Sequence, residues 1–163
     1  MQQVFARIFA VGVCLLFAAC GTTTPLESQT KTQVASQGRI YFLRGNNYLG
    51  RGGAVEIKLN GQSVGNVANN SYFFVDRDAG AYKVTLEVPL TPGQYSLPVN
   101  VRAGSLTYIE VAPQTGNATA VLVGGLVGAA IAASASEDGK NATFRLALMD
   151  PAAGAALLQE LKK

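Results

Sequence analysis

Apolar and polar residues alternate in short segments along most of the chain after Gly38, and turn-forming residues separate these segments. Residues 54–59 and 81–88 alternate most clearly, which is typical of β-strands with one buried and one solvated face. Asn60-Gly61, directly after the first of them, is a strong signal for a tight hairpin turn. Short strands at close, even spacing predict a mainly β fold, an antiparallel β-sandwich or barrel, of which we take the sandwich. Further strands are expected at residues 39–44, 62–67, 71–75, 97–101, 106–111 and 142–149.

The end of the chain changes from this alternation to a helical pattern. Asp150-Pro151 precedes residues 152–161, which are rich in Ala and Leu. Asp at the N-cap and Pro in the first turn are typical of a helix start, and Lys162-Lys163 would complement the negative end of the helix dipole. We therefore expect a short C-terminal helix over residues 151–161.

One internal stretch fits neither pattern, because residues 118–135 carry no charge and consist mostly of small side chains. We treat residues 116–141 as a Gly/Ala-rich insertion appended to the sandwich. In a helix, Gly124, Gly128 and Ala132 would form a flat stripe of the kind that lets helices pack closely in lipid. Three interpretations stay open: a helix or hairpin on the domain or at the membrane surface, a self-association stripe, and a membrane span. A span is disfavoured because Ala and Gly supply little apolar area.

The first 19 residues are typical of a secretory signal peptide. A single positive charge, Arg7, precedes the apolar run of residues 8–17, which is too short to span a membrane. The sequence Leu16-Phe17-Ala18-Ala19-Cys20 resembles a lipobox, with Phe17 where Leu is more common. The pattern predicts cleavage before Cys20 and attachment of lipid to this cysteine. The alternative is a cut after Gly21 by the general signal peptidase.

Lipid attachment at Cys20 would make the membrane the first expected partner. Residues 20–37 are then the lipid anchor and a polar, flexible tether, and residues 38–163 form the β-sandwich domain. Removal of the signal peptide also removes Cys14, so that no disulfide can form within the mature chain.

Composition narrows the chemistry further. His is absent, and Lys and Arg total 13 against 10 for Asp and Glu, a balance too even to favour a nucleic-acid partner. Without His, and with Cys20 blocked, neither a Cys/His metal site nor a Ser-His or Cys-His nucleophile can be built. We therefore expect no cofactor, no metal and no enzymatic activity.

Three patterns suggest chemistry but fit it poorly. Asp76, Asp78 and Glu87 fall at the first, third and twelfth places of an EF-hand loop, yet Ala81 occupies the place that needs Gly. Residues 45–52 resemble a phosphate loop that lacks its Lys and Ser/Thr. We interpret both as strand connections. The aromatic residues Tyr41, Tyr48, Tyr72, Phe74 and Tyr108 could form a stacking face for a glycan or peptide, although covering the core is the favoured interpretation.

Several motifs together resemble those of a family of bacterial lipoproteins that is a domain of unknown function. They are Arg39-Ile40-Tyr41-Phe42, Leu59-Asn60-Gly61, the aromatic strand at 72–75 and Gly80-x-Tyr82, within a resemblance covering residues 38–111 and, more loosely, 142–161. The resemblance implies a carboxypeptidase-regulatory-like or prealbumin-like β-sandwich and no catalytic residues. It also implies transfer to the outer membrane, because Gly21 follows the anchor in place of the Asp that commonly retains lipoproteins at the inner membrane.

The sequence thus predicts a non-enzymatic lipoprotein of the cell envelope, anchored in the outer membrane and facing the periplasm, with a structural or binding role. Two alternatives stay open. The first is a homo-oligomer assembled through Gly124, Gly128 and Ala132, and the second is a sandwich that binds a glycan or peptide. An envelope protein is the other partner that we consider.

Overall fold

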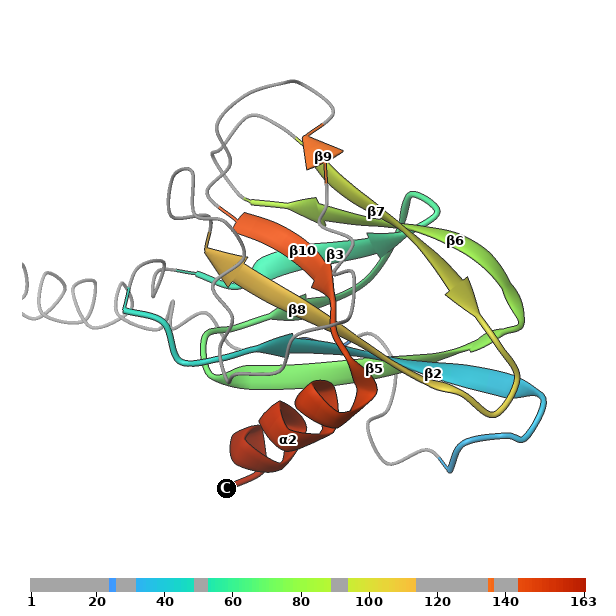
Figure 1. Ribbon diagram of the computed structural model, residues 1–163. Coiled ribbons are helices and arrows are strands. Elements are labelled where there is room, and N and C mark those ends of the chain that lie inside the picture. The colour runs from blue at the N-terminus through green and yellow to red at the C-terminus, as the bar shows by residue number, and fades with distance from the viewer. Residues whose placement is uncertain (1–23, 26–31, 49–52, 89–93, 114–134, 137–143) are drawn as a thin grey trace, which may run out of the picture.

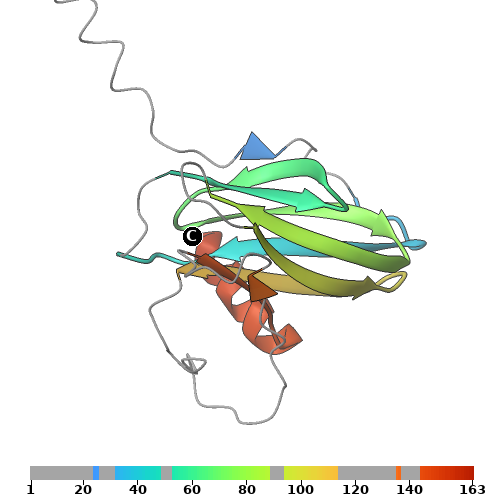
Figure 2. The same ribbon diagram turned by 90° about the horizontal axis from the view of Figure 1, so that it is seen from above.

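The structure consists of two stacked β-sheets and one helix (Figures 1 and 2). The computed structural model describes residues 24–25, 32–48, 53–88, 94–113, 135–136 and 144–163. The strands are β1 (Thr24–Pro25), β2 (Gln37–Arg44), β3 (Val55–Leu59), β4 (Gln62–Val67), β5 (Ser71–Asp78), β6 (Gly80–Glu87), β7 (Gln94–Val101), β8 (Leu106–Pro113), β9 (Ala135–Ser136) and β10 (Phe144–Leu148).

The strands form a six-stranded sheet in the order β1-β4-β3-β6-β7-β9 and a four-stranded sheet in the order β10-β8-β2-β5. The predicted mainly β sandwich is confirmed. One pair departs from the expected antiparallel arrangement, because β2 and β8 are parallel, with Tyr41 opposite Tyr108. A parallel pair needs a long crossover connection, and here the chain passes through the other sheet twice between these two strands.

Most predicted strands are present with bounds that differ by a few residues. The Asn60-Gly61 turn between β3 and β4 is confirmed, and both residues have the positive φ angles, 49° and 82°, that such a tight turn requires. The strand connection expected at Asp76 and Asp78 is shorter than predicted, because β5 continues to Asp78 and only Ala79 separates it from β6. The extra length pairs Asp76 with Arg39 of β2.

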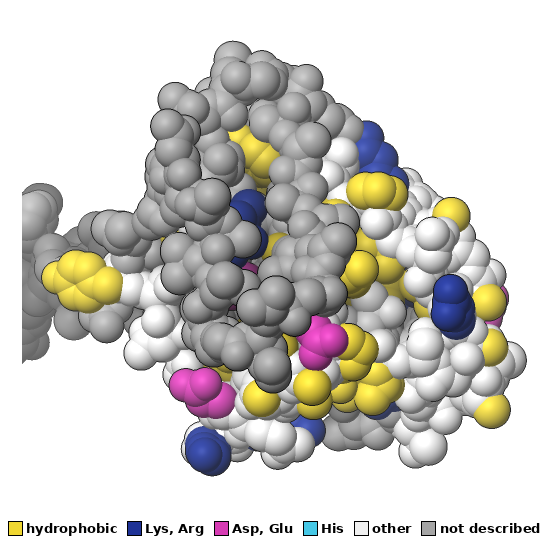
Figure 3. Space-filling model, viewed as in Figure 1, with side chains coloured by type: hydrophobic (Ala, Val, Ile, Leu, Met, Phe, Trp, Pro, Cys, Tyr) yellow, Lys and Arg dark blue, Asp and Glu magenta, His cyan; other side chains and the backbone are white. Residues whose placement is uncertain are grey.

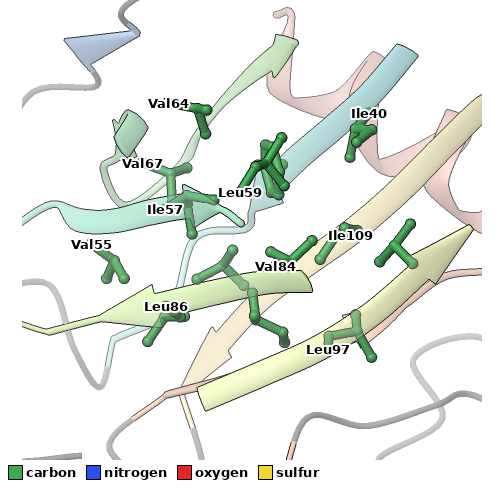
Figure 4. Close-up of a cluster of buried hydrophobic side chains, with 14 of the residues drawn as sticks. Ile40, Val55, Ile57, Leu59, Val64, Val67, Val84, Leu86, Leu97 and Ile109 are labelled. Atoms are coloured by element: carbon green, nitrogen blue, oxygen red, sulfur yellow. The ribbon is translucent and has the colours of Figure 1, made fainter. Parts of the chain in front are cut away.

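The core lies between the two sheets (Figure 4). Alternation in β3 directs Val55, Ile57 and Leu59 into the core, while the residues between them stay at the outer face. Each such side chain contributes about 1.5–3 kcal/mol on burial, which is the main stabilising term of the described domain. Other buried members of this core are Ile40, Phe42, Val64, Val67, Phe73, Val75, Val84, Leu86, Tyr95, Leu97, Val99, Val101, Ile109, Val111, Phe144 and Leu146.

The helix α2 (Pro151–Leu161) packs on the outer face of the four-stranded sheet (Figure 1). Its predicted N-cap is confirmed, because the Asp150 carboxylate accepts hydrogen bonds from the backbone N–H groups of Ala152, at 2.9 Å, and Ala153, at 3.4 Å. Gly154 and Leu158 are its buried residues. No helix in the described part of the chain is both long and apolar enough to cross a membrane.

Part of the segment expected to be a tether contacts the domain. Thr24 and Pro25 pair with Asn66 and Gly65 of β4. Farther along, the Gln33 side-chain amide donates to the backbone carbonyls of Gln37 and Ser105, at 3.1 and 3.3 Å. The anchor and the remainder of the tether stay predictions.

Candidate functional site

The outer face of the four-stranded sheet carries a row of aromatic side chains. Tyr41 of β2 lies opposite Phe74 of β5 on one side and Tyr108 of β8 on the other. The ring centroids of Tyr41 and Phe74 are 5.4 Å apart and tilted by 58°. Those of Tyr41 and Tyr108 are also 5.4 Å apart, with the rings stacked at 12°. Such offset and tilted pairs stabilise beyond their buried area, so that the row is a rigid unit.

One end of this row carries an ion pair with two parallel hydrogen bonds. Arg39 Nε lies 2.7 Å from Asp76 Oδ1, and Arg39 Nη2 donates to Asp76 Oδ2 at 2.9 Å. The Asp76 side chain is 0% exposed and that of Arg39 is 12% exposed. The Arg39 guanidinium also lies 3.9 Å above the Phe74 ring centre, a cation–π contact. The hydrogen bond to Asp76 raises the pKa of Arg39 above its ordinary value.

The other end of the row lies beneath α2. Leu43, Tyr108 and Leu158 form a second, small buried cluster. Gly154 sits directly on the tyrosine, because a Cβ atom at this position would lie less than 3.0 Å from the Cβ, Cγ and Cδ2 atoms of Tyr108. Burial, and secondarily the neighbouring Tyr41, raises the pKa of the Tyr108 phenol above its ordinary value. The helix therefore depends on a glycine at its contact with the sheet.

This arrangement decides between the two interpretations of the aromatic residues. Phe74 is 6% exposed and Tyr108 is 5% exposed, so neither ring offers a face to a ligand. Tyr41 and Tyr72 are half-buried in the cluster beneath α2. Four of the five residues therefore have a packing role, as the favoured interpretation expects, but on the outer face of the four-stranded sheet and not over the core between the sheets. The fifth, Tyr48, is 82% exposed and lies apart from the row, in the loop after β2.

A groove of about 330 Å³ opens beside the row, where the two sheets separate. Its lining comes from Pro98–Asn100 of β7, Leu106–Tyr108 of β8, Leu148, Met149 and Pro151. Within the described part of the chain, no strand pairs with Leu106 on the side away from β2, since the pairing of β10 ends opposite Ile109. The backbone N–H of Met149 donates to the Tyr108 carbonyl, so the main-chain groups of Tyr108 point away from β2. Alternate residues of a strand direct their N–H and C=O groups to the same side, so those of Leu106 also point away from β2.

The acidic residues of the EF-hand-like pattern do not come together. Asp76 pairs with Arg39, and Asp78 accepts a hydrogen bond from the Gln37 side chain at 3.1 Å. Glu87 accepts from Lys58 Nζ at 2.7 Å, on the other sheet. Within the residues that the structure describes, no group of three or more His, Cys, Asp or Glu side chains could hold a metal ion.

The remaining sequence-predicted sites lie outside the described residues. These are the lipid-attachment residue Cys20 and the stripe of Gly124, Gly128 and Ala132. Of the phosphate-loop-like stretch, Gly50 to Gly52 are likewise outside, so the structure offers no test of it.

Sequence reasoning missed Arg44, a fully buried cation at the end of β2. Its Nη1 donates to the carbonyls of Gly53 and Val67, each at 3.0 Å, and its guanidinium lies 4.6 Å from the Phe144 ring centre. Burial lowers the pKa of Arg44. The sequence contained one signal for this buried cation, because Arg44 directly follows the apolar run of residues 40–43.

The fold and this face define a two-sheet β-sandwich protein with one outer sheet face covered by a helix. Residues 34–126 match the family described as "Protein of unknown function (DUF2846)", and the chain belongs to this family. It is also 26% identical over 154 residues to an "Uncharacterized protein" of Haemophilus influenzae (strain ATCC 51907 / DSM 11121 / KW20 / Rd), with 90% of this chain and 85% of that protein covered. No solved structure matches the chain. Membership in a family of unknown function is confirmed, while the lipid anchor and the prealbumin-like topology stay predictions.

Proposed function

We propose that this protein is a lipid-anchored protein of the bacterial cell envelope that acts as a structural or binding module. The observation that carries the proposal is the lipobox-like Leu16-Phe17-Ala18-Ala19-Cys20 after a short apolar run. Several acyl chains on one cysteine would hold the domain durably, since each buried methylene contributes about 0.8 kcal/mol. Gly21 after the anchor favours the outer membrane, with the domain in the periplasm.

The chemistry of the described acidic residues supports a non-enzymatic role. Two carboxylates that share a cleft are one route to acid–base catalysis in a chain without His. Asp76, Glu87 and Glu110 instead each pair with a cation, Arg39, Lys58 and Arg145 respectively. The role that fits such a surface is binding or support.

The anchor is tested by a single change. Cys20→Ser leaves no thiol for the lipid, so the protein should move from the membrane fraction to the soluble periplasmic fraction. Cys14→Ser, which changes a cysteine within the signal peptide, is the matched control and should leave the protein on the membrane. Membrane association of the Cys20→Ser variant equal to that of the wild type would contradict the proposal, as would an unmodified N-terminal peptide in mass spectrometry.

The groove beside Tyr108 favours a second candidate, the binding of an extended peptide such as the stem peptide of peptidoglycan. The groove offers the apolar side chain of Leu106 beside main-chain N–H and C=O groups of β8 that point away from β2. An extended peptide uses such groups when it adds as a strand to the edge of a sheet. Muropeptide binding that survives deletion of residues 116–141 and is lost in Leu106→Asp would support this role. Binding that is unchanged in Leu106→Asp would place the ligand elsewhere.

Self-association through Gly124, Gly128 and Ala132 stays a further proposal. Gly128→Leu should break a detergent-solubilised oligomer if this stripe forms the contact, because the added side chain separates the two backbones. An unchanged elution volume in size-exclusion chromatography would count against it.

A further inference from the structure

The two ends of the sandwich differ in chemistry. One end, here called the asparagine end, is formed by Asn46–Tyr48 after β2 and by Asn69–Asn70 between β4 and β5. At the opposite end the chain turns between β5 and β6 and between β7 and β8, and Arg77, Asp78 and Arg102 lie there. Strand β2 runs from that charged end to the asparagine end, from right to left in Figure 1.

The direction of β1 indicates which end is nearer to Cys20. Strand β1 is antiparallel to β4, with Thr24 opposite Asn66 and Pro25 opposite Gly65. Strand β4 runs toward Asn69, so Thr24, the residue of β1 nearer to Cys20 in sequence, lies on the side of Pro25 that is closer to the asparagine end.

The number of residues between Cys20 and Thr24 indicates the same end of the sandwich. From Cys20 to Thr24 is four residue steps, which extend over at most about 14 Å. From Asn66 back to Gly61, at the charged end of β4, is five residues, or about 17 Å along the strand. While β1 stays paired, a lipid on Cys20 therefore cannot reach beyond the charged end, whereas the asparagine end is within its reach.

The side chains at the asparagine end suit a lipid surface. Tyr48 is 82% exposed, the largest fraction of any large apolar side chain in the described part of the protein. Its neighbours in sequence and across the loop are amides: Asn69 Oδ1 accepts from the Asn47 N–H at 3.1 Å, and Asn69 Nδ2 donates to Asn46 Oδ1 at 3.2 Å. Tyrosine is enriched at the headgroup level of membranes, and uncharged amides avoid the cost of desolvating a charge there.

Charge at this end comes from Glu87, the last residue of β6, and from the last turn of α2, which packs through Leu161 in the same cluster as Leu43. In Figure 3, acidic and basic side chains lie together over this helix. Lys162 and Lys163 follow it, with Glu160 as the opposing charge. Pro113, which precedes the Gly/Ala-rich insertion, and Ala135, which lies within it, are at the same end, because β8 finishes there and β9 pairs with the start of β7.

We propose that the asparagine end is the face that rests on the lipid surface, with Tyr48 at the headgroup level and the charged end directed away from the membrane. This orientation rests on the lipid anchor of the proposed function. In this orientation Thr24 lies within about 14 Å of the lipidated cysteine, so the domain is held closer to the membrane than a flexible tether over residues 20–37 would hold it.

Single cysteines test the orientation, because Cys20 is the only cysteine that remains after the signal peptide and lipid blocks it. Tyr48→Cys probes the asparagine end, Ala103→Cys the charged end, and Ser63→Cys the exposed side of β4. Each full-length lipidated variant is labelled with an environment-sensitive fluorophore and reconstituted into vesicles of phosphatidylethanolamine and phosphatidylglycerol that carry a headgroup quencher. We expect several-fold stronger quenching at position 48 than at position 103, with position 63 between them.

The outcomes separate the two proposals. Equal quenching at all three positions, or the strongest quenching at position 63 or 103, would overturn the orientation while leaving the anchor intact. If the lipidated protein does not float with the vesicles, both the anchor and the orientation are wrong. The Cys20→Ser background is the matched control and should abolish quenching at every position.

Discussion

The two sheets of the sandwich have outer faces of opposite character. On the six-stranded sheet this face is polar, with Glu56 and Lys58 of β3 beside Thr85 and Glu87 of β6. On the four-stranded sheet it is aromatic, and α2 covers part of it. Each face has one ion pair with a 2.7 Å contact, Lys58–Glu87 on the first and Arg39–Asp76 on the second. We expect the two pairs to contribute differently to stability despite their equal length, because they differ in exposure to water.

The strand sequences reflect this difference. Strand β3 reads Val-Glu-Ile-Lys-Leu, a strict alternation, because only one of its faces is buried. Strands β2 and β5 carry apolar runs such as Ile40–Leu43 and Tyr72–Val75, because both of their faces contact other parts of the protein. Continuous apolar runs thus indicate which sheet receives a second layer.

The largest expected effect is the loss of the ion pair on the covered face. Asp76→Asn keeps the shape of the side chain but leaves Arg39 without its carboxylate, in a site where the aspartate is fully buried. Breaking a buried pair in this way should lower the free energy of unfolding by about 3 kcal/mol, measured as a shift of the urea midpoint.

The double variant Arg39→Met with Asp76→Leu serves as the control for this prediction. It removes both charges, so it should be clearly more stable than Asp76→Asn alone. A midpoint for Asp76→Asn that matches the wild type would show that water reaches this pair as freely as the pair on the other sheet.

The next effect concerns the contact between α2 and Tyr108. Gly154→Ala raises helix propensity by about 1 kcal/mol, yet its Cβ would overlap the tyrosine and push the helix off the sheet, at a cost of about 1–3 kcal/mol. We expect net destabilisation in urea unfolding. The exposed position Ala156 is the control: there Ala→Gly should destabilise, so that glycine and alanine have opposite effects two residues apart. Stabilisation by Gly154→Ala would mean that α2 does not pack closely on Tyr108.

A smaller effect appears only at alkaline pH. Burial raises the pKa of Tyr108 above 10.0, so the folded protein retains this phenol proton to a higher pH than the unfolded chain does. The associated stability is fully present below about pH 10 and is lost as pH rises through the folded-state pKa. Tyr108→Phe removes this dependence, and its unfolding midpoint should fall less steeply between about pH 9 and pH 11 than that of the wild type. Identical slopes for the two proteins would contradict the burial of Tyr108.

Local pattern predicted the sandwich, the Asn60-Gly61 turn and the capped C-terminal helix, because each depends on residues close together in the sequence. The pair of Arg39 and Asp76 could not be predicted in this way, since the register of β2 against β5 brings together residues from separate strands. The parallel pairing of β2 with β8 and the contact of Gly154 with Tyr108 depend likewise on how distant elements pack. The strand connection expected at Asp76-x-Asp78 was placed too early for the same reason, because Asp76 belongs to β5 and pairs with Arg39 on a distant strand.

The smallest expected effect completes the comparison of the two faces. Glu87→Gln removes the charge that Lys58 Nζ contacts at 2.7 Å, but the side chains of Glu87 and Lys58 are 29% and 24% exposed. Water can solvate the ammonium that remains, and Glu56 offers it a second carboxylate at 3.7 Å. The hydrogen bond to Glu87 raises the pKa of Lys58, so this pKa should fall toward its ordinary value in the variant, as measured by NMR titration. The urea midpoint should stay within error of the wild type. A loss of stability as large as that of Asp76→Asn would mean that the polar face is as shielded from water as the aromatic one.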